Sequence, residues 1–346
     1  MKQHSIMFVL WVVLVAVVIA CMPGCLAMDM LPAGGPPGKP PEGVTAVRFE
    51  STNGVMLTGW LHNADSRKFD REMSRLGRTG LHLPEGGLVV FCHGVYDSAN
   101  SNMCEFLTEA GVAVLSFDYR GFGDSTPAEK TNSGFADDAI AALEFARSLP
   151  GIDRRRVVLY GHSMGGVYAL AAASKTWEVG EPVRGVATGG TFSNWRSASN
   201  HLVPVIGLLL GGVWGPEPTF WAARLGHTPL LIVHASDDMN VPPFHAAALA
   251  EAARDGKTPV QMFMPAGGGH VFGYFSEAMD LSSMEIARPY EETVAEARAE
   301  AGGPSDRNSA VGKAAQGPGG VGGAERAADH LLVWLTRRMD NGRAKP

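Results

Sequence analysis

A serine flanked by glycines carries the clearest chemical signal in the sequence. Ser163 lies in YGHSMGG (160–166), after the run RRRVVL and before VYALAAAS, which favours a helix. A serine on such a sharp strand-to-helix turn requires a positive φ, and glycines two positions before and after it let the turn close against neighbouring elements. At a helix N-terminus, the dipole and free N–H groups favour a developing oxyanion beside the hydroxyl. The pattern predicts that Ser163 is a nucleophile.

A nucleophilic serine needs a general base, and the base needs a group that orients it. In the chain order serine, acid, histidine, each group follows a strand. Asp237 and Asp238 follow the apolar run 229–234, and His270 follows three glycines after the next apolar run. Other histidines, such as His227, lack both the strand-end position and a glycine-rich loop. We therefore expect His270 to be the base and one of the two aspartates to be the acid.

Strand and helix patterns alternate along the middle of the chain. Continuous apolar strands separated by amphipathic helices indicate an α/β fold with a mostly parallel sheet, covered by helices on both faces. Asn53-Gly54 between the first two strands favours an antiparallel hairpin at one edge. The expected strands are 45–50, 55–61, 88–92, 112–117, 156–160, 184–188, 229–234 and 259–264, and the expected helices are 101–110, 134–148, 164–175, 243–255 and 325–339.

These elements together resemble the α/β-hydrolase superfamily. The acid loop of that family commonly reads HGxxDxxVP, and residues 234–242 read HASDDMNVP, which aligns Asp238 with the acid and leaves Asp237 as the alternative. Residues 118–125, DYRGFGDS, resemble a turn that is structural in the family. The resemblance covers about residues 45–275 and the last helix. It implies an α/β-hydrolase fold with a small cap, of a branch that is either lysophospholipase- or esterase-like or serine aminopeptidase-like.

The resemblance also implies an oxyanion hole. Residues 91–95, FCHGV, resemble the family's HG-x element after the third strand. The donors would then be the backbone N–H groups of Val95 and Met164. His93 would brace the loop, and Cys92 is expected to be a core residue because a cysteine at a strand end commonly packs as a small apolar side chain.

Residues 189–228, before the acid strand, would form the cap that sets specificity. Apolar and aromatic walls suit an acyl chain or an aromatic ester. An aminopeptidase must neutralise a free α-ammonium, commonly with carboxylates, and Glu217 is the one carboxylate in this segment. We therefore expect an ester or lipid substrate, with peptides as the alternative, and no metal or cofactor. The expected pocket residues are Trp195, Trp214, Phe220 and Trp221.

The N-terminus resembles a bacterial secretion signal. The apolar run 6–21 is short for a membrane span and right for the core of a signal peptide. Its end, Val-Ile-Ala-Cys21, resembles a lipobox, which implies a signal peptide at 1–20 and a lipidated Cys21. An uncleaved anchor helix and an ordinary signal peptide are the alternatives. Residues 21–43 would be a Pro/Gly-rich tether that anchors the domain (44–346) to the cell envelope, facing the periplasm or the exterior.

A long stretch, 276–325, separates the expected base from the last expected helix. It includes a predicted helix at 290–301 and a glycine-rich spacer at 302–323. Because the spacer has little to bury, we expect it to be disordered. The stretch is predicted to be an insertion within the domain, and a lid over the site and a docking segment for a partner are the alternatives to disorder.

The composition excludes several classes of protein. A net charge of −6 argues against a nucleic-acid partner, because phosphate binding needs a concentrated basic surface. Four cysteines are too few for a disulfide scaffold. The remaining competitor of another class is a non-catalytic envelope protein that uses the same fold to bind a partner.

Overall fold

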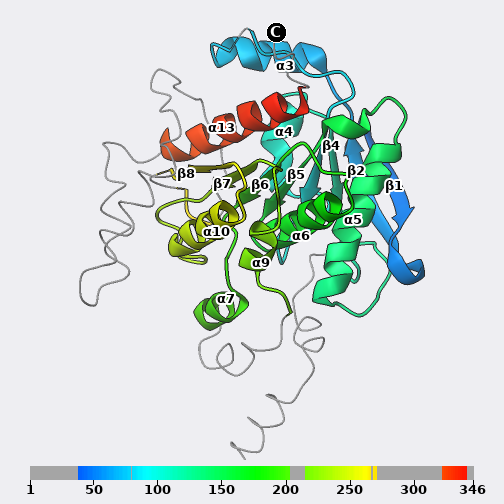
Figure 1. The fold of residues 1–346 in the computed structure, drawn as a ribbon. Coiled ribbons are helices and arrows are strands. Elements are labelled where there is room, and N and C mark those ends of the chain that lie inside the picture. The colour runs from blue at the N-terminus through cyan, green and yellow to red at the C-terminus, as the bar shows by residue number, and fades with distance from the viewer. Residues whose placement is uncertain (1–37, 79, 203–214, 266–267, 271–321, 341–346) are drawn as a thin grey trace, which may run out of the picture.

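One sheet of eight strands organises the protein. The computed structural model describes residues 38–78, 80–202, 215–265, 268–270 and 322–340 (Figure 1). The strand order is β1-β2-β4-β3-β5-β6-β7-β8; β2 pairs antiparallel with β1 and β4, and every other pair is parallel. The strands are β1 (Val44–Glu50), β2 (Met56–His62), β3 (Leu88–Cys92), β4 (Val114–Phe117), β5 (Val157–His162), β6 (Val186–Gly189), β7 (Leu230–Val233) and β8 (Val260–Phe263).

The central strands are apolar along their whole length because helices cover both faces of the sheet. In β3, Leu88, Val90 and Cys92 pack into the hydrophobic cluster on one face, and Val89 and Phe91 pack into the cluster on the other. This alternation follows from the two-residue period of a strand. The continuous apolar runs in the sequence therefore mark strands that are buried on both sides.

The helices form a layer on each face of the sheet (Figure 1). One layer contains α5 (Asn132–Ser148), α6 (Met164–Glu178), α9 (Pro218–Ala222) and α10 (Phe244–Asp255). The other contains α3 (Ser66–Arg75), α4 (Glu105–Glu109) and α13 (Gly322–Met339). The short helix α7 (Trp195–Leu202) follows β6, and single 3-10 turns lie at Thr52–Gly54, Asn102–Cys104 and Arg154–Arg156.

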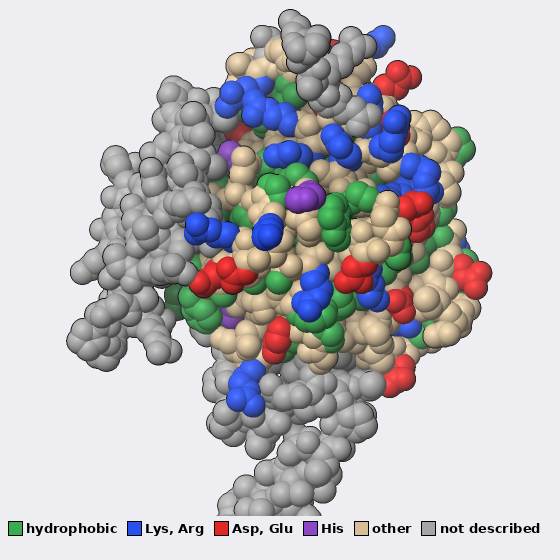
Figure 2. All heavy atoms as spheres, viewed as in Figure 1, with side chains coloured by type: hydrophobic (Ala, Val, Ile, Leu, Met, Phe, Trp, Pro, Cys, Tyr) green, Lys and Arg blue, Asp and Glu red, His purple; other side chains and the backbone are tan. Residues whose placement is uncertain are grey.

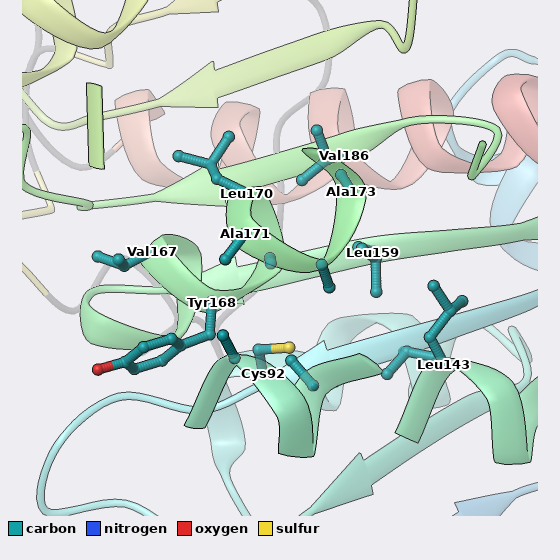
Figure 3. Close-up of a cluster of buried hydrophobic side chains, with 14 of the residues drawn as sticks. Cys92, Leu143, Leu159, Val167, Tyr168, Leu170, Ala171, Ala173 and Val186 are labelled. Carbon is teal, nitrogen blue, oxygen red and sulfur yellow. The ribbon is translucent and has the colours of Figure 1, made fainter. Parts of the chain in front are cut away.

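Small side chains let α6 lie close to the sheet and to α5. Figure 3 shows Ala171 and Ala173 of α6 among larger side chains of its neighbours, including Leu143 of α5 and Leu159 of β5. Twelve residues of α6 are buried. Such close packing fixes the start of α6, and therefore the residue before it, with little freedom.

The α/β-hydrolase fold and the edge hairpin agree with the expectation from sequence, and each expected strand is present within a few residues. The expected helix 101–110 is instead a 3-10 turn followed by the short α4. Helix α3 was not expected, because its sequence SRKFDREMSR is mostly charged and buries only Phe69 and Met73. Asp65 caps it by accepting hydrogen bonds from the N–H groups of residues 67 and 68.

Several expectations fall on parts of the chain that the structure does not describe. These are the signal peptide, Cys21, most of the tether, residues 203–214 of the cap and residues 276–321. Helix α13 begins at Gly322, inside the stretch 276–325 that was predicted to be an insertion. Within the described ranges, no helix has both the length and the apolar character needed to cross a membrane.

One titratable side chain of α13 is half-buried, and one of its ring nitrogens has no hydrogen-bond partner among the described residues. The ring of His330 stacks on Phe263 at 4.8 Å between centroids, and its Nε2 is buried with no hydrogen bond to the part of the chain that the structure describes. Burial, followed by the charges of Arg337 and Arg78, lowers the pKa of His330 to about 4. The folded protein therefore keeps this imidazole neutral at pH values where an unfolded chain would protonate it.

We predict that His330 makes the fold less stable as the pH falls. Since its pKa is about 4 in the folded chain and 6.5 in the reference state, its contribution is fully present above pH 6.5 and is lost between 6.5 and 4. The loss is at most about 1.4 kcal/mol per pH unit. Urea unfolding near pH 7 and near pH 5 should show a smaller loss of unfolding free energy in His330→Phe than in wild type. An equal loss in both proteins would contradict this.

Candidate active site

Ser163 occupies a strained turn between β5 and α6. Its backbone has φ 54° and ψ −120°, a positive φ that residues other than glycine rarely adopt. Its N–H donates to the carbonyl of Gly189 at 2.7 Å. A Cβ atom at position 165 would overlap the carbonyl of Cys92, so only glycine lets the first turn of α6 approach the end of β3. The turn has the geometry that the sequence predicted.

The structure brings Ser163, His270 and Asp238 into one hydrogen-bonded chain. Because a carboxylate can only accept, His270 Nδ1–H donates to Asp238 Oδ2 at 2.8 Å. This leaves Nε2 to accept from the Ser163 hydroxyl at 3.0 Å. The three residues follow β5, β7 and β8, and the carboxyl ends of these parallel strands lie at the same edge of the sheet. In this arrangement, the imidazole can take a proton from the hydroxyl while the carboxylate fixes its tautomer.

The surroundings of Asp238 favour its ionised form. Its side chain is buried and accepts hydrogen bonds from the N–H groups of Asn240 at 2.9 Å and Val241 at 2.8 Å. Burial alone would raise the pKa of this carboxyl, but the hydrogen bond and charge of His270 and the Val241 N–H outweigh it and hold the pKa below its usual value. The carboxylate therefore stays charged at neutral pH.

Asp237, the alternative acid, has a different partner. Its Oδ1 accepts from the backbone N–H of Gly269 at 2.8 Å, so it binds the segment that carries the histidine instead of the imidazole itself. The structure therefore places Asp238, and not Asp237, against His270.

A second histidine fixes the backbone of His270, and sequence reasoning did not find it. His162, the last residue of β5, is buried, and its Nε2–H donates to the carbonyl oxygen of His270 at 2.8 Å. Burial, followed by the nearby His270, lowers the pKa of His162 to about 3, so the ring is neutral near pH 7. Together with Asp237, His162 holds the main chain of residues 269 and 270.

The loop after β3 carries Val95, one of the two expected oxyanion donors, and passes beside Ser163: a Cβ atom on Gly94 would lie 3.4 Å from the Ser163 Cβ. His93 is buried beside Tyr119, and its Nδ1–H donates to the carbonyl of Gly94 at 2.7 Å. That carbonyl belongs to the same peptide unit as the N–H of Val95, so the bond fixes the direction of this N–H. The second expected donor, Met164, is the first residue of α6, where N–H groups have no partner within the helix.

The Cys92 thiol and the turn at residues 118–125 have partners that stabilise the fold. The Cys92 thiol is buried in the core, and burial raises its pKa to about 12, which keeps it protonated (Figure 3). Asp118 accepts from the N–H of Ala99 at 2.7 Å, and the Ser125 hydroxyl donates to the Asp118 carbonyl at 2.7 Å. The hydrogen bonds of the His270 ring go to Ser163 and Asp238, so Cys92 and Ser125 keep the surroundings expected of structural residues.

The expected pocket residues occupy different environments. Trp195 lies in the hydrophobic core, 5% exposed, and Trp221 is half-buried against it. Phe220 is 38% exposed, with the guanidinium of Arg224 3.5 Å from its ring centroid. Trp214 lies outside the described residues. Trp195 therefore belongs to the packing of the cap against the sheet, which a list of aromatic residues could not distinguish from a pocket wall.

Comparison with known proteins agrees with this fold. Residues 87–228 match a family model described as the alpha/beta hydrolase fold. The uncharacterized protein YfhR of Escherichia coli O157:H7 is 27% identical over 238 residues, which cover 68% of this chain and 76% of that protein. Human Protein ABHD12B is 32% identical over 219 residues, 58% of this chain and 60% of its own.

A solved structure of a Pyrococcus furiosus esterase superposes with a TM-score of 0.52 at 16% identity, covering 68% of this chain and 88% of that one. At this identity the likeness concerns the fold. Together with the strand order, these findings show that the chain has the α/β-hydrolase fold.

Proposed function

We propose that the protein is a serine hydrolase that cleaves carboxylic esters through an acyl-enzyme intermediate. The observation that carries the proposal is the chain from Ser163 Oγ to His270 Nε2 (3.0 Å) and from His270 Nδ1 to Asp238 Oδ2 (2.8 Å). A neutral imidazole in this tautomer is competent to act as the general base for the hydroxyl. The strained turn at Ser163 holds the hydroxyl at the helix N-terminus.

The reaction would proceed in two halves. Ser163 Oγ attacks the ester carbonyl while His270 takes its proton, and the N–H groups of Val95 and Met164 bind the resulting oxyanion. His270 then protonates the leaving alcohol, and the acyl group stays on Ser163. In the second half, His270 removes a proton from water, which attacks the acyl carbonyl. Release of the carboxylate returns the proton to Ser163. Asp238 stabilises the imidazolium in both halves.

Glu217 supports an ester over a peptide substrate. It is the one carboxylate between residues 189 and 228, and its Oε2 accepts from the backbone N–H of Trp195 at 2.8 Å. Burial raises the pKa of this carboxyl, and the bond to Trp195 already engages one of its two oxygens. A serine aminopeptidase would need a carboxylate that is charged and open to the substrate.

The proposed location is the bacterial cell envelope. The apolar run before Cys21 and the Pro/Gly-rich tether support a lipoprotein whose domain faces the periplasm or the exterior. An ester or lipid substrate would then reach the site from the envelope. Phe220, partly exposed in the cap, supports an acyl-binding surface.

Labelling with a fluorophosphonate probe tests the nucleophile. Because the probe reacts with activated serines, the folded protein should be labelled at Ser163, and Ser163→Ala should lose at least about a thousandfold in ester turnover. Ser148→Ala, an exposed serine of α5, is the matched control and should label like wild type. Absence of labelling in folded wild-type protein would overturn the hydrolase proposal in favour of a non-catalytic binding protein.

Substrate comparison tests the bond that is cleaved. Since Glu217 is bonded to Trp195, we expect p-nitrophenyl acyl esters to have a higher kcat/KM than amino-acyl p-nitroanilides. Glu217→Gln should leave the ester rate nearly unchanged. The peptidase alternative requires the reverse, namely faster anilide cleavage that the Glu217→Gln variant loses.

Substitution of His162 tests the positioning of the base. Removing one partner of a buried hydrogen bond costs about 1–3 kcal/mol, so His162→Ala should lower kcat roughly 5- to 150-fold with little change in KM. His162→Gln, whose amide can still donate, should recover part of the loss. The pH at half-maximal kcat should not move, because His162 is neutral well above its pKa of about 3. A wild-type kcat in folded His162→Ala would contradict the assignment.

A further inference from the structure

A second concave region lies at the sheet edge opposite Ser163. It is a cavity of about 420 Å³ formed by the end of α6, the loops that precede β6 and β7, and the end of α13. Because β5, β6 and β7 are parallel, residues before β6 and β7 lie at the amino edge, whereas Ser163 follows the carboxyl end of β5. The cavity is therefore separate from the catalytic constellation.

Three arginines line this cavity, and none of them forms an ion pair with a carboxylate of the described residues. Arg184 Nε–H donates to the main-chain carbonyl of Arg338 at 3.3 Å, which brings the two residues together, and Arg337 is the neighbour of Arg338 in α13. Among the described residues, none of the three guanidiniums lies within 4.0 Å of a carboxylate oxygen. Of the lining residues that the structure describes, Asp340 is the one acid. Like charges held together in this way repel one another unless an anion joins them.

The neighbouring charges also disfavour the protonated form of Arg338. Its guanidinium lies 5.1 Å from the ring centroid of Trp334 and is half-buried. Burial, followed by the charges of Arg184 and Arg337, lowers the pKa of Arg338. An anion in the cavity would relieve both effects.

A buried hydroxyl without a hydrogen-bond partner among the described residues belongs to a residue that lines this cavity. Thr228 lines the cavity and is only 2% exposed, and its Oγ1 has no hydrogen-bond partner among the described residues. A buried hydroxyl without a hydrogen bond is destabilising, and a ligand oxygen would supply the missing partner. His227 and Trp177, with ring centroids 5.4 Å apart, add a further donor and an apolar wall.

We propose that this cavity binds a doubly charged phosphate group, either free or as part of a larger molecule. In the described lining, three guanidiniums and one carboxylate leave two positive charges uncompensated. A phosphate monoester carries nearly two negative charges at neutral pH. Guanidinium forks match phosphate oxygens in pairs, and the Thr228 hydroxyl supplies another donor. Figure 2 shows that Lys and Arg side chains predominate over acidic ones in the upper half of the viewed face, near α13.

The first experiment measures binding of inorganic phosphate to the full chain. Titration calorimetry and thermal unfolding near pH 7 should show saturable binding and stabilisation by sodium phosphate, compared with sodium chloride at equal ionic strength. The double variant Arg184→Gln/Arg338→Gln should lose at least about tenfold in affinity. Arg155→Gln is the matched control: Arg155 lies before β5 at the same edge, 78% exposed and bonded to Asp153, and should bind like wild type.

Thr228→Val provides a second test of phosphate binding in case the double variant does not fold. Valine preserves the shape of threonine and removes only the hydroxyl, so the variant should fold at least as stably as wild type without ligand. Its affinity for phosphate should fall roughly two- to tenfold. Ester turnover of all these variants should equal that of wild type, because the cavity is at the other edge of the sheet.

Vesicle flotation distinguishes a lipid from a soluble source of the phosphate. The full chain is mixed with phosphatidylcholine vesicles with and without phosphatidic acid. If the source is a lipid, phosphatidic acid increases flotation of wild type and Arg155→Gln but not of the double variant. If it is a soluble compound, inorganic phosphate saturates the cavity and the lipids make no difference. The proposal is overturned if wild type, Thr228→Val and the double variant respond alike in both experiments, or if none responds beyond chloride.

Discussion

The close approach of the α6 N-terminus to the end of β3 is the contact on which the site depends. Gly165 lies against the Cys92 carbonyl with no room for a side chain, so the chain must turn sharply at the residue before the helix. That turn forces the positive φ of Ser163. The cost of this strained backbone is of order 1–3 kcal/mol, and the densely buried α6 behind it offsets that cost. The orientation of the serine is therefore a property of the whole helix–sheet interface.

The candidate site residues that follow strands could be predicted from the sequence, because the order of the residues along the chain and their positions at strand ends restrict the choice. Ser163, His270 and the pair Asp237 and Asp238 could be found in this way, and so could every strand of the sheet. The choice between the two aspartates depended on resemblance to a family. The two residues are adjacent in the sequence, and only the folded loop determines which carboxylate faces the histidine. The structure separates them by partner: one carboxylate contacts the imidazole and the other contacts a backbone N–H.

Other features depend on contacts between distant segments, which leave no local pattern. His162 donates to a carbonyl 108 residues away, and nothing in the motif around it distinguishes that role from simple burial. Helix α3 exposes most of its side chains, so two apolar residues four apart are too weak a signal. The arginine-lined cavity combines parts of the chain from Trp177 to Asp340. Trp195 was expected to line the substrate pocket from its place in the cap segment, but the folded protein buries it in the hydrophobic core.

The two backbone hydrogen bonds at residues 269 and 270 have a consequence for how this chain can evolve. Gly269 N–H and His270 C=O are each hydrogen-bonded to a residue that follows or ends a strand, so two contacts that position the imidazole come from outside the chain that follows it. The link from His270 to α13 can then lengthen, shorten or diverge in sequence at little entropic cost to the site. Sequence changes between His270 and α13, the longest connection between described elements, can therefore accumulate with little effect on the position of the catalytic groups.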